Sequence, residues 1–289
     1  MKKTRILAGV LFALITTNTL LACQPTANDD SSPTSSFSQS FSSSSPESSS
    51  KSSASQSSEK PSSSSASVSA SEKPSEPVIS YAKYIRCTGN SVNIRSGAST
   101  SYSVLGSAEK GTTYAVLGYQ NGWYKTYYRN QTAYVSATYA SVFTLEKTSD
   151  KIENVIAEGY KLLGVPYVYG AVRIHDGKGK ILKGFTVNKF DCSSLVQYVL
   201  YKGASVLLNT NTRTQIKQGK YVNPKDLQRG DCIFFTNEDR QYNTGIERVG
   251  HVAIYLGDNY ILHTASDYAR IEQISSKRWG FYIEARRFI

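Results

Sequence analysis

The feature that most limits what this chain folds into is a serine-rich segment between Gln24 and Ile79. Almost every second residue of it is Ser, prolines and single charges interrupt it, and large apolar side chains are nearly absent. This composition buries too little apolar surface to offset the conformational entropy that folding removes. We therefore expect ordered structure only after residue 80, the part of the 289-residue chain that holds both Trp and all 21 Tyr.

The residues before this segment have the form of an export signal. Three basic residues lie within the first five, and the apolar run Ile6–Ile15 is shorter than the roughly 20 residues that cross a membrane. Leu20-Leu21-Ala22-Cys23 then resembles the lipobox of bacterial lipoproteins, in which the Cys is acylated and becomes the new N-terminus. The resemblance implies a signal peptide over 1–22 and a lipid anchor on Cys23, at the outer face of the cytoplasmic membrane. An ordinary signal peptide with an adjacent cysteine is the alternative.

Charge and cysteine content exclude several classes of function. Lys plus Arg number 33 against 22 Asp plus Glu, a net charge of +11 that favours anionic wall polymers or lipid surfaces as partners. Nucleic acid is not expected for an exported chain without a binding motif. Four Cys without a C-x2-C pair, beside three His, predict neither a zinc array nor a disulfide scaffold. No metal or other cofactor is expected.

Residues 23–80 are expected to form a disordered tether with an r.m.s. reach of roughly 40 Å.

Residues 81–145 have the pattern of a small all-β module. Short runs rich in Val, Tyr and Thr alternate with turns that contain Gly or Asn. Four motifs closely resemble the bacterial SH3 (SH3b) family: Val92-Asn93-Ile94-Arg95-Ser96-Gly97, Lys110-Gly111, Gly122-Trp123-Tyr124-Lys125 and Ala133-Tyr134-Val135. The resemblance implies a barrel that binds cell-wall peptides, or one that lies beside a catalytic domain and shapes its substrate pocket. Cys87, in the first predicted strand, is expected to be a buried apolar residue.

The remainder of the chain begins with a predicted amphipathic helix and continues to a cysteine placed for catalysis. Asp150 is expected to cap the first helix, which ends at Gly164. A second helix is predicted after Asp191-Cys192-Ser193, and Gly203 is expected to stop it. Cys192 thus lies at a helix N-terminus, where the dipole and unpaired N–H groups lower the pKa of a free thiol from about 8.5. A cysteine nucleophile acts as the thiolate.

The base that such a nucleophile requires must come from three histidines. His175 lies in a Gly- and Lys-rich stretch and is expected at the surface. His251 and His263 lie in two apolar runs separated by Gly257-Asp258-Asn259, a pattern that predicts a β-hairpin. A three-residue turn places both histidines on one face as diagonal neighbours, whereas a two-residue turn places them on opposite faces. The first arrangement makes Cys192 the nucleophile, His251 the general base and acid, and His263 the residue that orients His251.

A series of motifs in this region resembles the NlpC/P60 family of cysteine peptidases. In chain order they are Pro166-Tyr167-Val168-Tyr169-Gly170, Asp191-Cys192-Ser193, Arg213-Thr214 with Gln218-Gly219, Leu227-Gln228-Arg229-Gly230-Asp231, Phe234-Phe235, Gly250-His251-Val252 and Ile261-Leu262-His263. The resemblance implies a papain-like α+β fold and hydrolysis of peptidoglycan stem peptides, typically between γ-D-Glu and the following diamino acid. It assigns the catalytic roles to Cys192, His251 and His263.

The same resemblance implies roles for four further residues. The hydroxyl of Tyr167 faces the reacting centre and helps to hold the oxyanion. Asp191 and Ser193 contact the free amino terminus of the stem peptide, which suits charge-assisted recognition. Arg213 belongs with the substrate-binding residues. The alternative for Asp191 is a helix cap, a role that is compatible with recognition.

The expected domain organisation follows from these patterns, and three questions stay open. We expect a signal peptide at 1–22, a tether at 23–80, an SH3b domain at 81–145 and an NlpC/P60 domain at 146–289. The stretch 171–190 is longer than is usual in the family, and its basic residues are candidates for a lid over the cleft or an arm toward the wall. One alternative function is a wall-binding lipoprotein with an inactive peptidase domain. The other is a papain-like amidase or acyltransferase that acts on a different bond.

Overall fold

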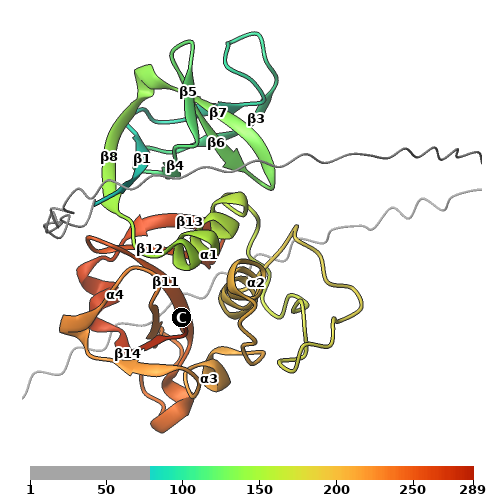
Figure 1. Cartoon of the computed structure of the whole chain (residues 1–289), viewed down its shortest axis with the longest axis vertical. Coiled ribbons are helices and arrows are strands. Elements are labelled where there is room, and N and C mark those ends of the chain that lie inside the picture. Colours follow the sequence, from blue (N-terminus) through green and yellow to red (C-terminus); the bar gives the residue numbers. More distant parts are fainter. Residues whose placement is uncertain (1–78) are drawn as a thin grey trace, which may run out of the picture. The chain divides into compact units, whose positions relative to one another are not determined.

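The computed structural model describes residues 79–289, which contain both helices and strands (Figure 1). The predicted signal peptide, the lipid anchor on Cys23 and the tether up to residue 78 lie outside the described residues. Within 79–289, no helix combines the length and the apolar character that crossing a membrane requires.

Residues 81–146 form strands, as their alternating pattern predicts. Five of these strands make one sheet in the order β3-β2-β7-β6-β5, and β8, β1 and β4 join a second, larger sheet. The strands are β1 (Tyr81–Cys87), β2 (Val92–Arg95), β3 (Val104–Ala108), β4 (Thr113–Ala115), β5 (Gly118–Gln120), β6 (Trp123–Tyr128), β7 (Gln131–Ser136) and β8 (Ala140–Glu146), with a 3₁₀ turn at Ala137–Tyr139.

The larger sheet has nine strands in the order β8-β1-β4-β13-β12-β11-β10-β14-β9. The pairing of Thr113 in β4 with Ile271 in β13 joins the two halves of the described chain. The C-terminal half contains α1 (Asp150–Lys161), α2 (Cys192–Ala204), α3 (Thr212–Gln215), β9 (Lys220–Val222), β10 (Cys232–Phe235), β11 (His251–Gly257), β12 (Tyr260–Ala265), β13 (Tyr268–Gln273), α4 (Ser276–Gly280) and β14 (Tyr282–Arg287), with 3₁₀ turns at Pro224–Asp226 and Gly245–Arg248.

The N-terminus of α1 lies one residue earlier than predicted. Ser149, not Asp150, is the N-cap: its backbone is extended and its side chain accepts a hydrogen bond from the Ile152 N–H. Asp150 instead lies in the first turn, where its negative charge suits the positive end of the helix dipole. The cap therefore follows the backbone conformation, because only a residue outside the helix can turn its side chain back to the free N–H groups.

The second helix is capped as predicted but ends differently. Asp191 is its N-cap and forms a capping box with Ser194, while Cys192 is the first helical residue. The helix continues through Gly203 and ends where Ser205 adopts a left-handed backbone conformation with φ of 57°. A Cβ at Gly203 would lie 2.4 Å from the Cα of Val155 in α1. Gly203 therefore allows two helices to approach closely and does not stop α2.

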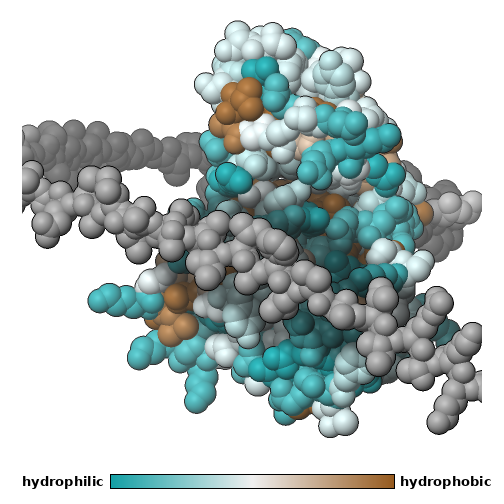
Figure 2. Space-filling model, turned by 180° about the vertical axis from the view of Figure 1, so that it is seen from behind, coloured by the Kyte–Doolittle hydropathy of each residue, from teal (hydrophilic) through white to brown (hydrophobic). Residues whose placement is uncertain are grey.

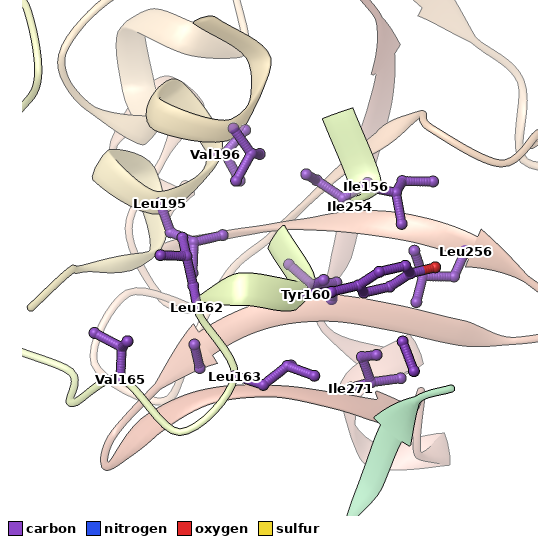
Figure 3. Packing of buried hydrophobic residues seen from close by; sticks show 14 of the residues in the cluster. Ile156, Tyr160, Leu162, Leu163, Val165, Leu195, Val196, Ile254, Leu256 and Ile271 are labelled. Carbon is purple, nitrogen blue, oxygen red and sulfur yellow. The ribbon is translucent and has the colours of Figure 1, made fainter. Parts of the chain in front are cut away.

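The core that fixes α2 in place lies between the two long helices and the nine-stranded sheet (Figure 3). Ile156 and Tyr160 of α1, with Leu195 of α2, are buried in one cluster with Ile254 and Leu256 of β11. A second cluster, which includes Phe235 and Ala253, packs against Trp279 and Phe281. Because both helices and β11 share one core, the start of α2 and the start of β11 are held at fixed positions.

On the face turned away from the view of Figure 1, hydrophilic side chains predominate among the visible described residues (Figure 2). Hydrophobic side chains on this face lie in separate patches, one of them over the N-terminal strands. Scattered apolar side chains of this kind are ordinary on a protein surface.

Candidate active site

Cys192 lies where two cavities meet. The first, called here the histidine-side cavity, has a volume of about 470 Å³ and is lined by Tyr167, Cys192, Thr236, Asn237, Glu238, Asp239, Gly250, His251, Ala265, Ser266, Ser275, Lys277, Arg278 and Phe281. The second, the arginine-side cavity, has a volume of about 500 Å³ and is lined by Tyr167, Tyr169, Gly170, Arg173, Asp191, Cys192, Ser193, Asn211, Thr212, Arg213, Asn237, Asp239, Arg240, Asn243 and Gly250. A chain-like substrate that crosses Cys192 extends into both.

The pKa of Cys192 is raised, contrary to the lowering expected at a helix N-terminus. Burial raises it to about 12, and the carboxylate of Asp191 acts in the same direction. Backbone hydrogen bonds from Val252 and Ser193 oppose this rise without reversing it. Cys192 as a residue is only 7% exposed, so the loss of hydration outweighs the field of the helix. Near neutral pH, Cys192 is therefore a neutral thiol, which becomes a nucleophile only if a base removes its proton.

The hairpin of β11 and β12 brings His251 and His263 together. Ile254 pairs with Leu262 and Tyr255 with Ile261, and the same register places the two histidines on one face as diagonal neighbours. His251 Nε2 lies 2.8 Å from His263 Nδ1, with the rings nearly perpendicular. Both rings are buried. The predicted juxtaposition of the two histidines is confirmed.

The hairpin has the two-residue turn, one of the two that the sequence allows, together with a bulge that was not predicted. Asp258 and Asn259 form a two-residue turn, and both have positive φ, 44° and 66°. The register then shifts between Tyr255 and Gly257, which leaves Leu256 as the extra residue of a bulge. The bulge cancels the one-residue shift that a two-residue turn introduces. The histidines therefore keep the relative position that a three-residue turn would have given.

Beyond His263, Glu272 continues the line of polar side chains. His263 Nε2 lies 3.1 Å from Glu272 Oε1, without the alignment of a hydrogen bond. Glu272 lies in β13 opposite Ile261, and hence diagonal to His263. Arg278 Nη2 donates to the same oxygen over 2.9 Å, and Arg270 Nη1 lies 3.7 Å from Glu272 Oε2. Two cations thus hold the carboxylate next to the histidine pair.

Burial and neighbouring charges set the protonation of this line. Burial lowers the pKa of His251 well below its ordinary value, and His263 and Arg278 act in the same direction. Burial also lowers the pKa of His263, although Glu272 acts in the opposite direction. Burial alone would raise the pKa of Glu272, but the contacts with His263, Arg278 and Arg270 outweigh it and lower that pKa to about 2. Near neutral pH, the line consists of two neutral imidazoles and one carboxylate.

These contacts allow us to infer the tautomers of both histidines. An ionised Glu272 favours the proton on His263 Nε2, which leaves His263 Nδ1 as an acceptor. The His251 Nε2–H then donates to that atom over 2.8 Å. His251 Nδ1 is consequently unprotonated. In this tautomer His251 is able to act as a base toward a proton donor in the histidine-side cavity.

Tyr167 and Arg213 lie in the cleft with Cys192. Tyr167 lines both cavities, and burial, reinforced by Cys192 and Asp191, raises the pKa of its hydroxyl to about 12. This hydroxyl therefore stays protonated and available as a donor. Arg213 lines the arginine-side cavity, and its Nε lies 3.4 Å from Glu247 Oε2.

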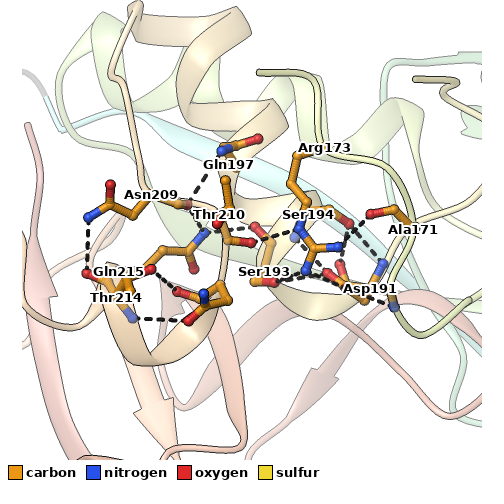
Figure 4. A network of polar contacts seen from close by, with 12 residues as sticks. Ala171, Arg173, Asp191, Ser193, Ser194, Gln197, Asn209, Thr210, Thr214 and Gln215 are labelled. Atoms are coloured by element: carbon orange, nitrogen blue, oxygen red, sulfur yellow. Dashed lines mark hydrogen bonds and ion pairs between the residues drawn. The ribbon is translucent and has the colours of Figure 1, made fainter. Parts of the chain in front are cut away.

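Asp191 and Ser193 are buried at the start of α2, and both contact Arg173 (Figure 4). The sequence marks Arg173 only as one basic residue of the long stretch 171–190, and it gives Glu272 no role. Both residues contact their partners from a different segment, Arg173 from the stretch before α2 and Glu272 from the strand after β12, so the spacing within one element does not indicate them. One sequence signal for Glu272 exists: Arg270 and Glu272 are two residues apart in β13, so both side chains lie on the same face of that strand.

The structure also tests what was expected of His175 and Cys87, two residues outside the cleft. His175, expected at the surface, is buried: its Nδ1 accepts a hydrogen bond from the Gly177 N–H, and its ring packs on Tyr201 of α2. The stretch 171–190 therefore folds back onto α2. Cys87 is buried as predicted, and among residues 79–289 Cys87, Cys192 and Cys232 are all free thiols. The same residues contain no cluster of three or more metal-ligating side chains.

Comparison with known families accounts for both halves of the described chain. Residues 164–287 match the NlpC/P60 family, and residues 90–141 match the bacterial SH3 domain. The chain contains an NlpC/P60 domain and a bacterial SH3 domain. Both resemblances derived from the motifs are thereby confirmed, and the NlpC/P60 match includes Cys192, His251 and His263.

The curated relatives match between 39% and 50% of this chain. The γ-DL-glutamyl hydrolase of Bacillus subtilis is 32% identical over 126 residues, 43% of this chain and 26% of that protein. The γ-D-glutamyl-L-lysine dipeptidyl-peptidase of Bacillus cereus is 29% identical over 140 residues, 47% and 36% of the two chains. A solved NlpC/P60 family structure from Bacillus cereus has 22% identity and a TM-score of 0.39, with 72% of this chain and 63% of that chain covered. The chain spans between about a quarter and a half of the curated relatives' lengths.

Proposed function

We propose that this protein is a cell-wall cysteine endopeptidase that hydrolyses peptidoglycan stem peptides between γ-D-Glu and the following diamino acid. One observation carries the proposal. His251, hydrogen-bonded to His263 over 2.8 Å, lines the same cavity as Cys192 within the residues that match the NlpC/P60 family. A thiol with a paired imidazole beside it in a cleft is the arrangement that acyl transfer by a cysteine requires.

The proposed reaction proceeds through a thioester on Cys192. Cys192 Sγ attacks the γ-carbonyl carbon of D-Glu while His251 Nδ1 takes the thiol proton. Because burial raises the pKa of the thiol to about 12 and lowers that of His251, proton transfer accompanies the attack and does not precede it. The tetrahedral adduct expels the amine of the diamino acid, to which His251 gives the proton. Water then attacks the thioester with His251 as base, and D-Glu leaves as a free carboxylate while Cys192 recovers its proton.

Two neighbours support this chemistry in the proposal. The protonated hydroxyl of Tyr167, which lines both cavities, donates a hydrogen bond to the developing oxyanion. His263 keeps His251 in the tautomer that leaves Nδ1 free, and Glu272 fixes His263 in turn.

The names of the relatives support the proposed bond, and the N-terminal sequence supports the proposed place of action. The matched relatives are named as γ-glutamyl hydrolases or peptidases and as peptidoglycan endopeptidases, including the Mycobacterium tuberculosis protein RipB at 28% identity. For this chain we propose action outside the cytoplasm, with export directed by residues 1–22 and a lipid anchor on Cys23. Anionic wall polymers are proposed as further contacts of the basic chain.

Defined muropeptides test this function directly. We expect the detergent-solubilised full chain, under reducing conditions, to yield products cut after γ-D-Glu, measured by mass spectrometry. Cys192→Ala is expected to reduce turnover to background and to leave the circular dichroism spectrum unchanged. Persistent turnover in that variant would remove Cys192 as the nucleophile. Release of whole stem peptides from glycan would indicate an amidase, and uncleaved substrate with wall sedimentation would support the wall-binding alternative.

A further inference from the structure

Arg173 is held beside the start of α2 by four contacts (Figure 4). Its Nη2 lies 2.8 Å from Asp191 Oδ2 and 3.0 Å from Ser193 Oγ. Its Nε donates to the carbonyl oxygen of Thr210 over 2.7 Å, and its Nη1 to that of Ala171 over 2.6 Å. The Arg173 side chain is only 17% exposed. The guanidinium is therefore a built part of the cleft wall.

The carboxylate of Asp191 has no acceptor position left for a substrate. Oδ1 accepts hydrogen bonds from Ser194 N–H over 2.8 Å and from the Ser193 hydroxyl over 2.9 Å. Oδ2 accepts from Arg173 Nη2 and, over 3.2 Å, from Gly170 N–H. A carboxylate offers about four such positions, so a further donor must displace one of these groups. Displacing Arg173 would leave a poorly hydrated guanidinium without its partner, which is strongly unfavourable.

This pair lies where a substrate must pass. Arg173, Asp191 and Ser193 all line the arginine-side cavity together with Cys192. Charged residues that line this cavity are three arginines and two aspartates: Arg173, Arg213, Arg240, Asp191 and Asp239. Since one of the aspartates is already neutralised by Arg173, the cavity has no negative excess that would attract an ammonium group.

We propose that the Arg173 guanidinium occupies the place beside Asp191 and Ser193 that a substrate's free amino terminus would otherwise take. The cleft then accepts stem peptides whose amino end is acylated, as it is when the peptide is still attached to glycan, and does not select for free amino ends. This inference rests on the proposed function and names its substrate class. It replaces the expectation that Asp191 and Ser193 contact a free amine. Arg173 acts here as a residue that determines specificity.

The test compares two peptides of one sequence that differ only at the amino end. One carries a free amine and the other an N-acetyl group, and kcat/KM is measured for both with the full chain. We expect wild type to cleave the acetylated peptide at least as well as the free one. Arg173→Ala uncovers Asp191 and Ser193 and is expected to raise the free-to-acetylated ratio at least tenfold. Arg248→Ala is the matched control, because Arg248 is exposed and outside both cavities, and its ratio should equal that of wild type.

A second measurement separates this inference from the proposed function. Calorimetry with Cys192→Ala measures the binding of both peptides without turnover, and it remains informative if Arg173→Ala does not fold. Equal binding of the two peptides, or tighter binding of the acetylated one, supports the inference even if the wild-type protein cleaves neither. Absence of cleavage would overturn only the proposed endopeptidase activity. More than tenfold preference of the wild-type cleft for the free amine overturns the inference and leaves the endopeptidase intact. Binding of neither peptide overturns both.

Discussion

Cys192 experiences two opposing effects, and their balance shows how this site works. The N-terminus of α2 favours a thiolate, whereas burial favours a thiol and raises the pKa to about 12. The same burial lowers the pKa of His251 and so keeps the imidazole neutral and able to accept a proton. Both shifts oppose the separate formation of a thiolate and an imidazolium, so in the proposed reaction the proton moves from Cys192 to His251 as the substrate carbonyl is attacked.

At this scale we predict a graded loss along the line of polar side chains. His251→Ala removes the base and should lower kcat by about 10²–10⁴-fold, the usual contribution of general acid–base catalysis. His263→Ala should lower kcat less, because orienting a base contributes less than being the base, and Glu272→Gln should lower it least. Steady-state kinetics with the acetylated peptide measures the order, and Glu284→Gln on β14, outside both cavities, is the matched control.

The pH dependence provides an independent check of the same residues. The base must be neutral, so kcat/KM is expected to fall as pH decreases through the pKa of His251. Because burial lowers that pKa, the acid limb should lie below the ordinary histidine value of about 6.5. An acid limb above pH 6.5, or equal losses for His251→Ala and His263→Ala, would contradict the graded roles.

At the scale of elements, two small features decide where the side chains point. The bulge at Leu256 keeps His251 and His263 on one face despite a two-residue turn. Gly203 lets α2 approach α1 so closely that a Cβ would meet the Val155 backbone. The bulge thereby places His263 beside His251, and the close approach of the two helices places Cys192 at the start of α2.

We predict that Gly203→Ala lowers the free energy of unfolding by about 1–3 kcal/mol, the typical cost of overpacking, because backbone cannot yield as a flexible side chain does. The loss of turnover should be larger than the fraction unfolded explains, since α2 carries Cys192. Denaturant titration and kinetics measure the two effects. Gly280→Ala is the control: no atom lies within 4 Å of its added Cβ, and its unfolding free energy should change by less than about 0.5 kcal/mol. A neutral result at Gly203 would refute the close-packing role.

At the scale of the whole described chain, the SH3 and NlpC/P60 domains share structure. They contribute strands to one nine-stranded sheet, and buried Arg229 links them. Arg229 Nη2 lies 3.0 Å from the hydroxyls of both Tyr84 in β1 and Tyr160 in α1, and its Nε lies 2.6 Å from Glu153 Oε1. A buried cation with this set of partners favours unfolding of both domains together.

The two tryptophans test this prediction, because Trp123 lies in the SH3 domain and Trp279 in α4 of the NlpC/P60 domain. Trp123→Phe and Trp279→Phe each leave one tryptophan, and we expect the denaturant transitions followed by its fluorescence to coincide. Arg229→Met should lower the unfolding free energy by about 3–5 kcal/mol, the cost of breaking a buried ion pair, whether Trp123 or Trp279 is the fluorescent probe. Two separated transitions would show that the domains unfold independently.

The sequence by itself determined the local chemistry: the all-β pattern of 81–145, the helix after Asp191, the hairpin with its two histidines, and the motifs of both families. These features depend on side-chain periodicity and capping, which are properties of short segments. Tertiary structure decided the burial that raises the pKa of Cys192, the contact of Glu272 with His263, and the pairing of Arg173 with Asp191. Burial and these contacts depend on how separate elements pack against one another, and the spacing within one element therefore does not determine them.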